Sequence, residues 1–299
     1  MPPIHSRLIS HVAILFTVLF WGMSFVSTKI ILNAGFPPLT LACVRFAVAS
    51  LVLFPIVKIK EPDTRPKGRS WFKVMLGGFL GVSAYFFFEN NGIKLTSASS
   101  AALIIATIPV FTLAAESIFF RHKIHLLQAG GIALSLIGVF FLIHPPGQRD
   151  ANPGHLLGNL LMLGACISWV AYITVSKTLR SSFSGVVLTA YNALFGSLFL
   201  LPVSLLEYHS WTWVSASVWL HILYLSVICS AVCYFLYLFA LAMLKPTVVA
   251  SYINLIPVVG AIGGVILLNE MMDVAQILAA LGVISGVVLV HVPRSSHLK

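Results

Sequence analysis

Charged side chains are scarce in this sequence of 299 residues. Only 9% of the residues are charged, whereas 59% are hydrophobic, and the mean hydropathy is +1.00. A soluble protein of this length carries roughly 25% charged residues. Because too few polar side chains are present to cover a surface that faces water, we expect lipid to surround most of the chain.

Cysteine is also rare, and its positions do not form a metal-binding or disulfide pattern. The four cysteines, Cys43, Cys166, Cys229 and Cys233, lie inside apolar runs. They have neither the spacing of zinc ligands nor the oxidising setting in which structural disulfides persist. We interpret them as small core residues, and we predict no metal and no cofactor.

Sequence motifs typical of enzymes are missing as well. The chain has no H-E-x-x-H, no G-x-S-x-G and no Gly-rich phosphate-binding loop with lysine. It also lacks the rings of like charge or the carbonyl filter of a channel. The longest polar stretch, 58–70, has the length of a loop, so no soluble receptor domain is expected. These absences argue against an enzyme, a channel and a receptor, and they favour a transporter.

Long apolar runs occupy most of the chain. Each is close to the ~20 residues that a helix needs to cross the hydrocarbon core of a bilayer. We place the runs at 9–33, 38–57, 73–95, 98–120, 125–143, 156–179, 183–206, 217–243, 246–269 and 274–292. The sequence therefore predicts an all-α membrane protein with ten transmembrane helices.

The basic residues are distributed unevenly between the two sides of these spans. The formal net charge is +10, and ten spans place both termini on one side. If that side is the cytoplasm, the inner segments hold 14 of the 18 Lys and Arg residues, whereas the outer loops hold Lys94 and Arg149. The positive-inside rule therefore predicts cytoplasmic termini. We expect a multi-pass protein of the plasma (inner) membrane. The basic excess is explained by topology, and we predict no nucleic-acid partner.

The sequence repeats itself at a distance of 148 positions. Trp21 recurs as Trp169 and Lys29 as Lys177. The same distance joins Ala102 with Ala250, Ile108–Val110 with Ile256–Val258, Gln128 with Gln276, Gly138 with Gly286 and Pro145 with Pro293. We predict two five-helix repeats, residues 1–146 and 154–299, joined by a linker rich in Pro and Gly. Because five is odd, the second repeat enters the membrane from the opposite face, and such inverted repeats can exchange conformations around a central site.

Ionisable residues inside the spans are candidates for function because their burial in hydrocarbon is costly. Glu89 and Glu116 could each bind an amine or carry a coupling proton. The alternatives are a position at the outer interface for Glu89 and pairing with Arg121 for Glu116. We expect Arg45 either to pair with another protein group or to contact a substrate carboxylate.

Aromatic and amide side chains near the span centres are candidates for a substrate cavity. They are Trp21, Tyr85, Trp169, Tyr172, Tyr234, Tyr252 and Asn254. Trp and Tyr usually lie at membrane interfaces, so their mid-depth positions indicate a cavity for amphipathic or cationic solutes, with ordinary core packing as the alternative.

Proline and glycine mark places where the helices are expected to bend or to pack closely. Pro109 and Pro257 lie in the middle of the fourth and ninth spans, and they predict bends beside the cavity or kinks that merely shape packing. Small-residue faces occur at Gly77/Gly81, Gly260/Gly264 and Gly282/Gly286. They are typical of internal packing or of a dimer contact, so we expect a monomer or a homodimer.

Several local sequences together resemble the EamA-type drug/metabolite transporters. They are Phe20-Trp21-Gly22, Arg45-Phe46, Ser97–Ala102, the Ile-Pro pairs of spans four and nine, and Leu268-Asn269-Glu270. The resemblance covers nearly the whole chain and implies ten helices, cytoplasmic termini and export of small metabolites, often amino acids or their derivatives. The family commonly has an acidic residue at the end of helix four as well as helix nine. Here Glu270 is matched by His122, which indicates a loop or cap role for Glu270.

We therefore expect a secondary transporter that exports small metabolites, amino acids or their derivatives, by alternating access. Its expected partners are a small-molecule substrate and the lipid bilayer. The alternatives are an exchanger or uptake carrier for nucleotide sugars or phosphorylated metabolites, and a multidrug exporter. The spans lack clustered Lys and Arg, which argues against phosphorylated cargo.

Overall fold

A computed structural model describes residues 4–120, 124–143, 153–179, 182–244 and 246–290, and all regular elements in these residues are helices. The first half contains α1 (Ile4–Asn33), α2 (Pro38–Lys60), α3 (Arg69–Gly78), the π-helical segment η1 (Phe79–Ala84), α4 (Tyr85–Leu95), α5 (Ala98–Ile105), α6 (Ile108–Phe120) and α7 (Leu126–Ile143). The second half contains α8 (Pro153–Lys177), α9 (Gly185–Leu205), the short 3-10 turn η2 (Tyr208–Ser210), α10 (Ala216–Leu223), the π-helical segment η3 (Tyr224–Val232), α11 (Cys233–Met243), α12 (Pro246–Ile253), α13 (Ile256–Leu268) and α14 (Val274–Val290).

Most of these helices are long and apolar enough to cross a membrane. Within the described residues, eight helical runs meet this condition, and two further apolar helices, α13 and α14, have 13 and 17 residues. Apolar side chains such as Leu8, Val12 and Phe16 are exposed on the outer face of α1, as contact with lipid requires. The predicted all-α membrane class agrees with this arrangement.

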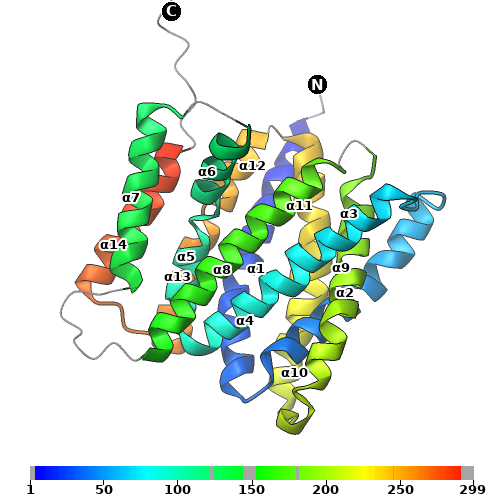
Figure 1. Ribbon diagram of the computed structural model, residues 1–299, viewed down its shortest axis with the longest axis horizontal. Coiled ribbons are helices and arrows are strands. Elements are labelled where there is room, and N and C mark those ends of the chain that lie inside the picture. Colours follow the sequence, from blue (N-terminus) through cyan, green and yellow to red (C-terminus); the bar gives the residue numbers. More distant parts are fainter. Residues whose placement is uncertain (1–3, 121–123, 144–152, 180–181, 245, 291–299) are drawn as a thin grey trace, which may run out of the picture.

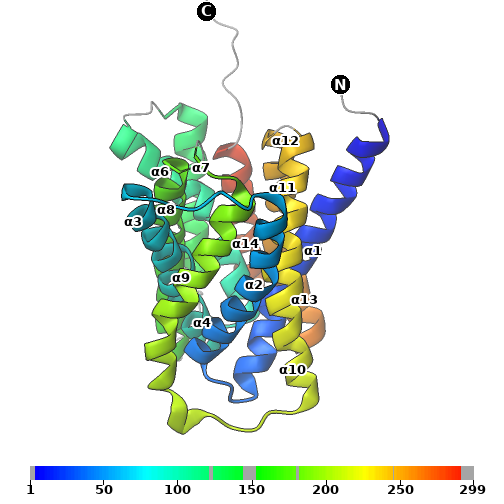
Figure 2. The same cartoon turned by 90° about the vertical axis from the view of Figure 1, so that its right-hand side faces the viewer.

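The helix bounds recur at the distance that the sequence repeat predicts. The elements α4, α5 and α6 have counterparts α11, α12 and α13 that begin and end 148 positions later. Figures 1 and 2 show that α1 begins and α14 ends at the same end of the bundle. In Figure 1, α8 ends near the level at which α1 begins, so these two corresponding helices run in opposite directions. The predicted linker at 144–154 lies almost entirely outside the described residues.

Helices of the two halves pack against each other along the bundle. The helix α2 lies against its counterpart α9, α5 lies against α13, which is the counterpart of α6, and α7 lies against its counterpart α14. Glycine allows the last pair to touch through the backbone, because an added Cβ at Gly138 would lie 2.7 Å from the carbonyl oxygen of Ala279. Gly81 and Gly260 similarly face Tyr172 and Ala102 of this same chain. These glycines therefore support internal helix packing.

The fourth and ninth spans are interrupted rather than continuously bent. Helix α5 ends at Ile105 and α12 ends at Ile253, and each is followed by two turn residues. Pro109 and Pro257 are the second residues of α6 and α13. A proline ring clashes with the carbonyl four residues earlier, which is the carbonyl of Ile105 or Ile253. Each preceding helix therefore ends where the proline would otherwise collide with it.

The two π-helical segments are a feature that the hydrophobic pattern did not predict. They occupy Phe79–Ala84 and Tyr224–Val232, near corresponding positions in the two halves. A π segment turns the following side chains to new directions and is common at functional sites. In η3, the Ser230 hydroxyl donates to the carbonyl oxygen of Leu225, five residues earlier, at 2.9 Å.

Candidate binding site

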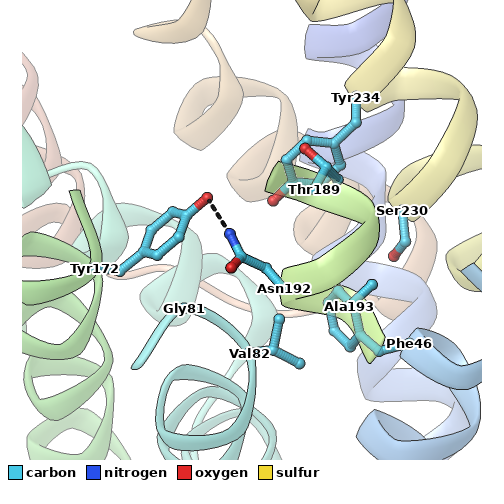
Figure 3. A pocket seen from close by; sticks show the side chains of 9 residues that line it. All are labelled: Phe46, Gly81, Val82, Tyr172, Thr189, Asn192, Ala193, Ser230 and Tyr234. Carbon is cyan, nitrogen blue, oxygen red and sulfur yellow. Dashed lines mark hydrogen bonds between the residues drawn. The ribbon is translucent and has the colours of Figure 1, made fainter. Parts of the chain in front are cut away.

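A small pocket lies inside the bundle, and both halves of the chain contribute to it. Its lining comes from α2, η1, α8, α9, η3 and α11. Figure 3 shows the nine side chains that line it: Phe46, Gly81, Val82, Tyr172, Thr189, Asn192, Ala193, Ser230 and Tyr234. The space between them has room for about one water molecule, ~10 Å³. The pocket therefore has to widen before it can hold a metabolite.

Asn192 places an amide group on the pocket wall. Its Nδ2 donates to the hydroxyl of Tyr172 over 3.4 Å, the contact drawn in Figure 3. Its Oδ1 is buried and has no hydrogen-bond partner in the described residues. Gly77 makes room for this side chain, because an added Cβ there would lie 3.0 Å from Oδ1. The amide oxygen is thus an unused acceptor within the lining.

Arg45 is held beside the pocket by a lining residue. Its side chain, on α2, is 7% exposed, and its Nε donates to Ser230 Oγ at 2.7 Å. Its guanidinium carbon lies 4.7 Å from the ring centre of Phe86 and 5.4 Å from that of Phe46. Cation–π contact with these rings stabilises the charge away from water.

Glu89 supplies the opposite charge from α4. It is also 7% exposed, and the Tyr85 hydroxyl, one helical turn earlier, donates to its Oε1 at 2.8 Å. The ring of Tyr85 lies 4.8 Å from that of Phe86, which is also the ring nearest the Arg45 guanidinium carbon. In the part of the chain that the structure describes, however, Arg45 and Glu89 form neither a hydrogen bond nor an ion contact. The site therefore contains two buried opposite charges that do not touch.

Two tryptophan side chains pack against aromatic residues that line the pocket or lie beside the charges. The Trp169 ring centre lies 5.1 Å from that of Tyr85 and 5.0 Å from that of Tyr172. Trp21 packs edge-on against Tyr234 at 5.4 Å, and its Nε1 donates to the Cys229 carbonyl at 2.9 Å. Trp21 and Trp169, which the repeat relates, therefore make equivalent contacts. Each packs against the helix that follows the π-helical segment of the other half, α11 for Trp21 and α4 for Trp169.

Two of the nine side chains that the sequence suggested for the cavity, Tyr172 and Tyr234, line this pocket. The hydrogen bonds and ring contacts above connect five more to the lining, directly or through one another: Trp21, Arg45, Tyr85, Glu89 and Trp169. The last two are not among the lining residues. Tyr252 pairs with His11, its hydroxyl 3.2 Å from His11 Nδ1, and belongs to a separate apolar cluster. Asn254 lies in the turn between α12 and α13. The side chain of Glu116 is outside the described residues.

Sequence reasoning missed three polar residues of the lining. They are Thr189, Asn192 and Ser230. Asn192 gives a usable signal, since it is an amide inside the apolar span 183–206. Serine and threonine are common in membrane helices and bond to their own backbone, so Thr189 and Ser230 give no distinctive signal.

Polar contacts join the two halves of the chain at the end of the bundle where α2 and α5 begin. Glu270 Oε1 accepts from the Ala98 N–H at 2.7 Å, and its Oε2 accepts from Ser99 N–H at 2.9 Å and Ser99 Oγ at 2.6 Å. This confirms the cap role expected for Glu270. Glu207 caps α2 in the same way, since its Oε2 accepts from the Thr40 N–H at 2.7 Å and from the Thr40 hydroxyl at 2.8 Å.

Lys29 adds a third contact at this end of the bundle. Its Nζ donates to the carbonyl oxygens of Ile93 at 2.8 Å, Lys94 at 3.3 Å and Thr96 at 2.5 Å, where α4 ends. A cation at a helix C-terminus and carboxylates at helix N-termini both complement the helix dipole. The two carboxylates join elements of the second half to helices of the first.

Comparison with known proteins places these features in a family. The model of the EamA-like transporter family matches residues 8–144 and 156–292. A probable amino-acid metabolite efflux pump of Escherichia coli is 30% identical over 285 residues, covering 91% of each chain. A probable terminal-alkyne amino-acid exporter of Streptantibioticus cattleyicolor is 26% identical over 280 residues, covering 93% of this chain and 92% of that protein.

A further relative and one solved structure are also similar to this chain over nearly its whole length. An uncharacterized transporter of Archaeoglobus fulgidus is 27% identical over 281 residues, covering 94% of this chain and 96% of that protein. One solved crystal structure covers 95% of this chain and 96% of its own, with a TM-score of 0.65 and 17% sequence identity. That likeness concerns the fold alone.

Proposed function

We propose, from the premise that this chain belongs to the EamA-like transporter family, that it is a secondary transporter exporting amino acids or their derivatives by alternating access. The observation that carries the proposal is the central pocket, because both halves line it and a buried cation and a buried anion lie beside it. Two similar proteins carry names that refer to amino-acid efflux or export.

The architecture that we infer is a pair of inverted five-helix repeats with ten membrane crossings. The recurrence of helix bounds at 148 positions supports it, as do the opposite directions of α1 and α8 in Figure 1. The interrupted pair α12 and α13 then forms one crossing, and α14 forms the last. Inverted repeats provide alternating access because each half can adopt the conformation of the other.

Alternating access requires that one end of the bundle is closed while the other opens. We infer that the contacts of Glu270 with α5 and of Glu207 with α2 close the end at which these helices begin. The loop 61–68 at the opposite end is flanked by Lys58 and Lys60 and contains Arg65 and Lys67. Under the positive-inside rule we infer that this basic end faces the cytoplasm of a plasma (inner) membrane, with the termini on the same side. The sealed end then faces outward.

The charge beside the pocket favours amino acids over phosphorylated solutes. Among the described residues, Arg45 is the one Lys or Arg that bonds to a side chain of the lining. Binding a phosphate group usually recruits several cations. A neighbouring carboxylate, Glu89, would repel such a group. Exchange of nucleotide sugars or phosphorylated metabolites is therefore the weaker alternative.

A counterflow assay in proteoliposomes tests the proposal. Purified protein is reconstituted, and accumulation of radiolabelled amino acids is compared with that of sugar phosphates. We expect at least one amino acid to accumulate against an excess of the same unlabelled amino acid inside. Exchange of phosphorylated solutes without any movement of amino acids would refute the proposal.

Two glycine variants provide a matched pair for this assay. At Gly81, an added Cβ would lie 2.5 Å from Tyr172 Cδ2, so Gly81→Ala pushes a lining ring into the pocket. At Gly130, an added Cβ meets nothing within 4 Å. We expect Gly81→Ala to lose most counterflow activity and Gly130→Ala to keep it. Equal activity in the two variants would show that this pocket is not on the transport path.

A further inference from the structure

We propose that Arg45 and Glu89 together bind the two charges of a zwitterion. The guanidinium group takes the substrate carboxylate, and the Glu89 carboxylate takes the substrate ammonium group. The inference rests on the proposed function and extends it, because it names the substrate class as free amino acids rather than acylated, esterified or phosphorylated solutes.

The burial of two charges that do not touch is the first reason. Arg45 and Glu89 are each 7% exposed and lie inside apolar helices, where an unpaired charge is costly. A direct ion pair would reduce that cost, yet the described residues contain no such pair between them. The two groups lie on either side of one pair of rings, because the guanidinium carbon of Arg45 is 4.7 Å from the ring centre of Phe86, which lies 4.8 Å from that of Tyr85, the donor to Glu89. A solute with a negative and a positive group, inserted in the matching order, satisfies both charges at once.

The hydrogen bonds of Arg45 leave the end of its guanidinium group available. A guanidinium has five N–H donors, and its two terminal nitrogens form a fork that matches a carboxylate. The hydrogen bond of Arg45 in the described residues uses Nε, which donates to Ser230 Oγ. Ser230 and the ring of Phe86, 4.7 Å from the guanidinium carbon, hold the group in place. The fork is therefore positioned before a substrate arrives.

Glu89 retains an acceptor of its own. The Tyr85 hydroxyl donates to Oε1, and this is the hydrogen bond to Glu89 in the described residues. The second oxygen, Oε2, can accept from an ammonium group. The ring of Tyr85 packs against Trp169, so an aromatic wall stands beside the carboxylate. Such a wall attracts a cation through its electron-rich face.

The repeat contains this pair of charges once. The positions related to Arg45 and Glu89 in the second half are Ala193 and Tyr237. Ala193 lines the pocket, as do Ser230 and Tyr172 in Figure 3. The two halves are nearly symmetric, but the cation and the anion each occur once, so the site has a positive side and a negative side. That polarity fixes the direction in which an amino acid lies, with its side chain toward the aromatic lining.

Substrate analogues test the inference on the unaltered protein. Counterflow of a transported amino acid is inhibited with three compounds: the amino acid itself, its N-acetyl derivative and its methyl ester. The N-acetyl form lacks the ammonium group and the ester lacks the carboxylate. We expect each derivative to inhibit roughly ten- to a hundred-fold more weakly than the parent, as loss of a hydrogen bond to a charged group implies.

Two variants test which residue binds the ammonium group of the substrate and which binds its carboxylate. Glu89→Gln should remove the discrimination against the N-acetyl derivative and keep that against the methyl ester. Arg45→Gln should do the reverse. Glu61→Gln is the matched control, because Glu61 lies in the loop that follows α2, and both discriminations should remain.

The outcomes separate this inference from the proposed function. If the protein moves amino acids but both derivatives inhibit as well as the parent, the zwitterion site is wrong and the transport function stands. The zwitterion site is also wrong if Glu89→Gln and Arg45→Gln leave both discriminations intact. If no amino acid is moved, the proposed function fails and this inference fails with it. Should a variant not elute as a folded species, the analogue series on the unaltered protein still decides.

Discussion

Ser230 connects the π segment to the charge beside the pocket. Its hydroxyl accepts from Arg45 Nε at 2.7 Å and donates to the carbonyl oxygen of Leu225 at 2.9 Å. A regular α-helical turn would direct this hydroxyl elsewhere, because a π segment adds a residue to the turn. The unusual helix geometry and the position of Arg45 therefore depend on each other.

Removal of this hydroxyl should weaken binding of a substrate carboxylate. In Ser230→Ala, Arg45 loses the hydrogen bond that orients it, and we expect the KM for a transported amino acid to rise about tenfold, equivalent to about 1.4 kcal/mol. Ser226→Ala is the control, because Ser226 lies in the same segment and donates only to its own helix, at the Ile222 carbonyl. Uptake kinetics with equal KM in both variants would contradict this role of Ser230.

Among the helices, the interrupted spans show what a sequence can and cannot predict. Pro109 and Pro257 were visible in the sequence, and each is the second helical residue after the two turn residues that interrupt the fourth or the ninth span. The length of the interruption was not predictable, because it depends on how the freed backbone groups are satisfied. The Thr107 hydroxyl bonds to the Ile104 carbonyl at 2.6 Å, and the Leu255 N–H bonds to the Tyr252 carbonyl at 2.9 Å. These local bonds stabilise turns in place of kinked helices.

Replacement of a proline at an interruption should stabilise a continuous helix. In Pro109→Ala, the clash with the Ile105 carbonyl disappears, and alanine favours a helix interior over proline by about 3 kcal/mol. We expect the Tm in detergent to be unchanged or higher while the transport rate falls, because the interruption lets α5 and α6 move separately. Pro55→Ala is the control, since α2 continues through Pro55. A fall of transport in both variants alike would count against a special role for the interruption.

The caps that join the two halves make a different prediction. Glu270→Gln replaces a charged acceptor at the start of α5 by a neutral one. We expect the closed state to be destabilised relative to the open state by about 1 kcal/mol. We expect faster opening at that end, measured as increased reactivity of an engineered cysteine there. Asp273→Asn is the control, because Asp273 caps the start of α14 through the N–H of Gln276 in its own helix segment. Equal reactivity in the two variants would exclude the cap of Glu270 from gating.

For the whole molecule, the repeat was the most informative sequence feature. It predicted which helices correspond, and the structure reproduces three of them with identical bounds at 148 positions. The depth of a residue in its span, however, does not tell which way the side chain points. Tyr252 and Asn254 were expected in the cavity on depth alone. Neither is among the residues that line the pocket, and the Tyr252 hydroxyl lies 3.2 Å from His11 Nδ1. The polar residues with the clearest placement, Arg45 and Glu89, were those whose burial costs most.

Asymmetry between the halves bears on specificity at this scale. The frame repeats, whereas Arg45 and Glu89 occur once and oppose Ala193 and Tyr237 in the second half. A symmetric frame can open to either side with similar energy, and a single pair of charges can hold a substrate in one orientation in both states. In the mechanism that we propose, the repeat provides the movement and the differences between its copies provide recognition of the substrate.

The central claim is that the two sides of the membrane reach one pocket alternately. Thr189 lines that pocket and is partly exposed. In a variant with Thr189→Cys and without the four native cysteines, which are buried and free, a membrane-impermeant thiol reagent is applied to one side of oriented vesicles. We predict reaction from the cytoplasmic side without amino acid, and with saturating amino acid a faster reaction from the outer side and a slower one from the inner side. Simultaneous access from both sides, or no response to amino acid, would contradict the account.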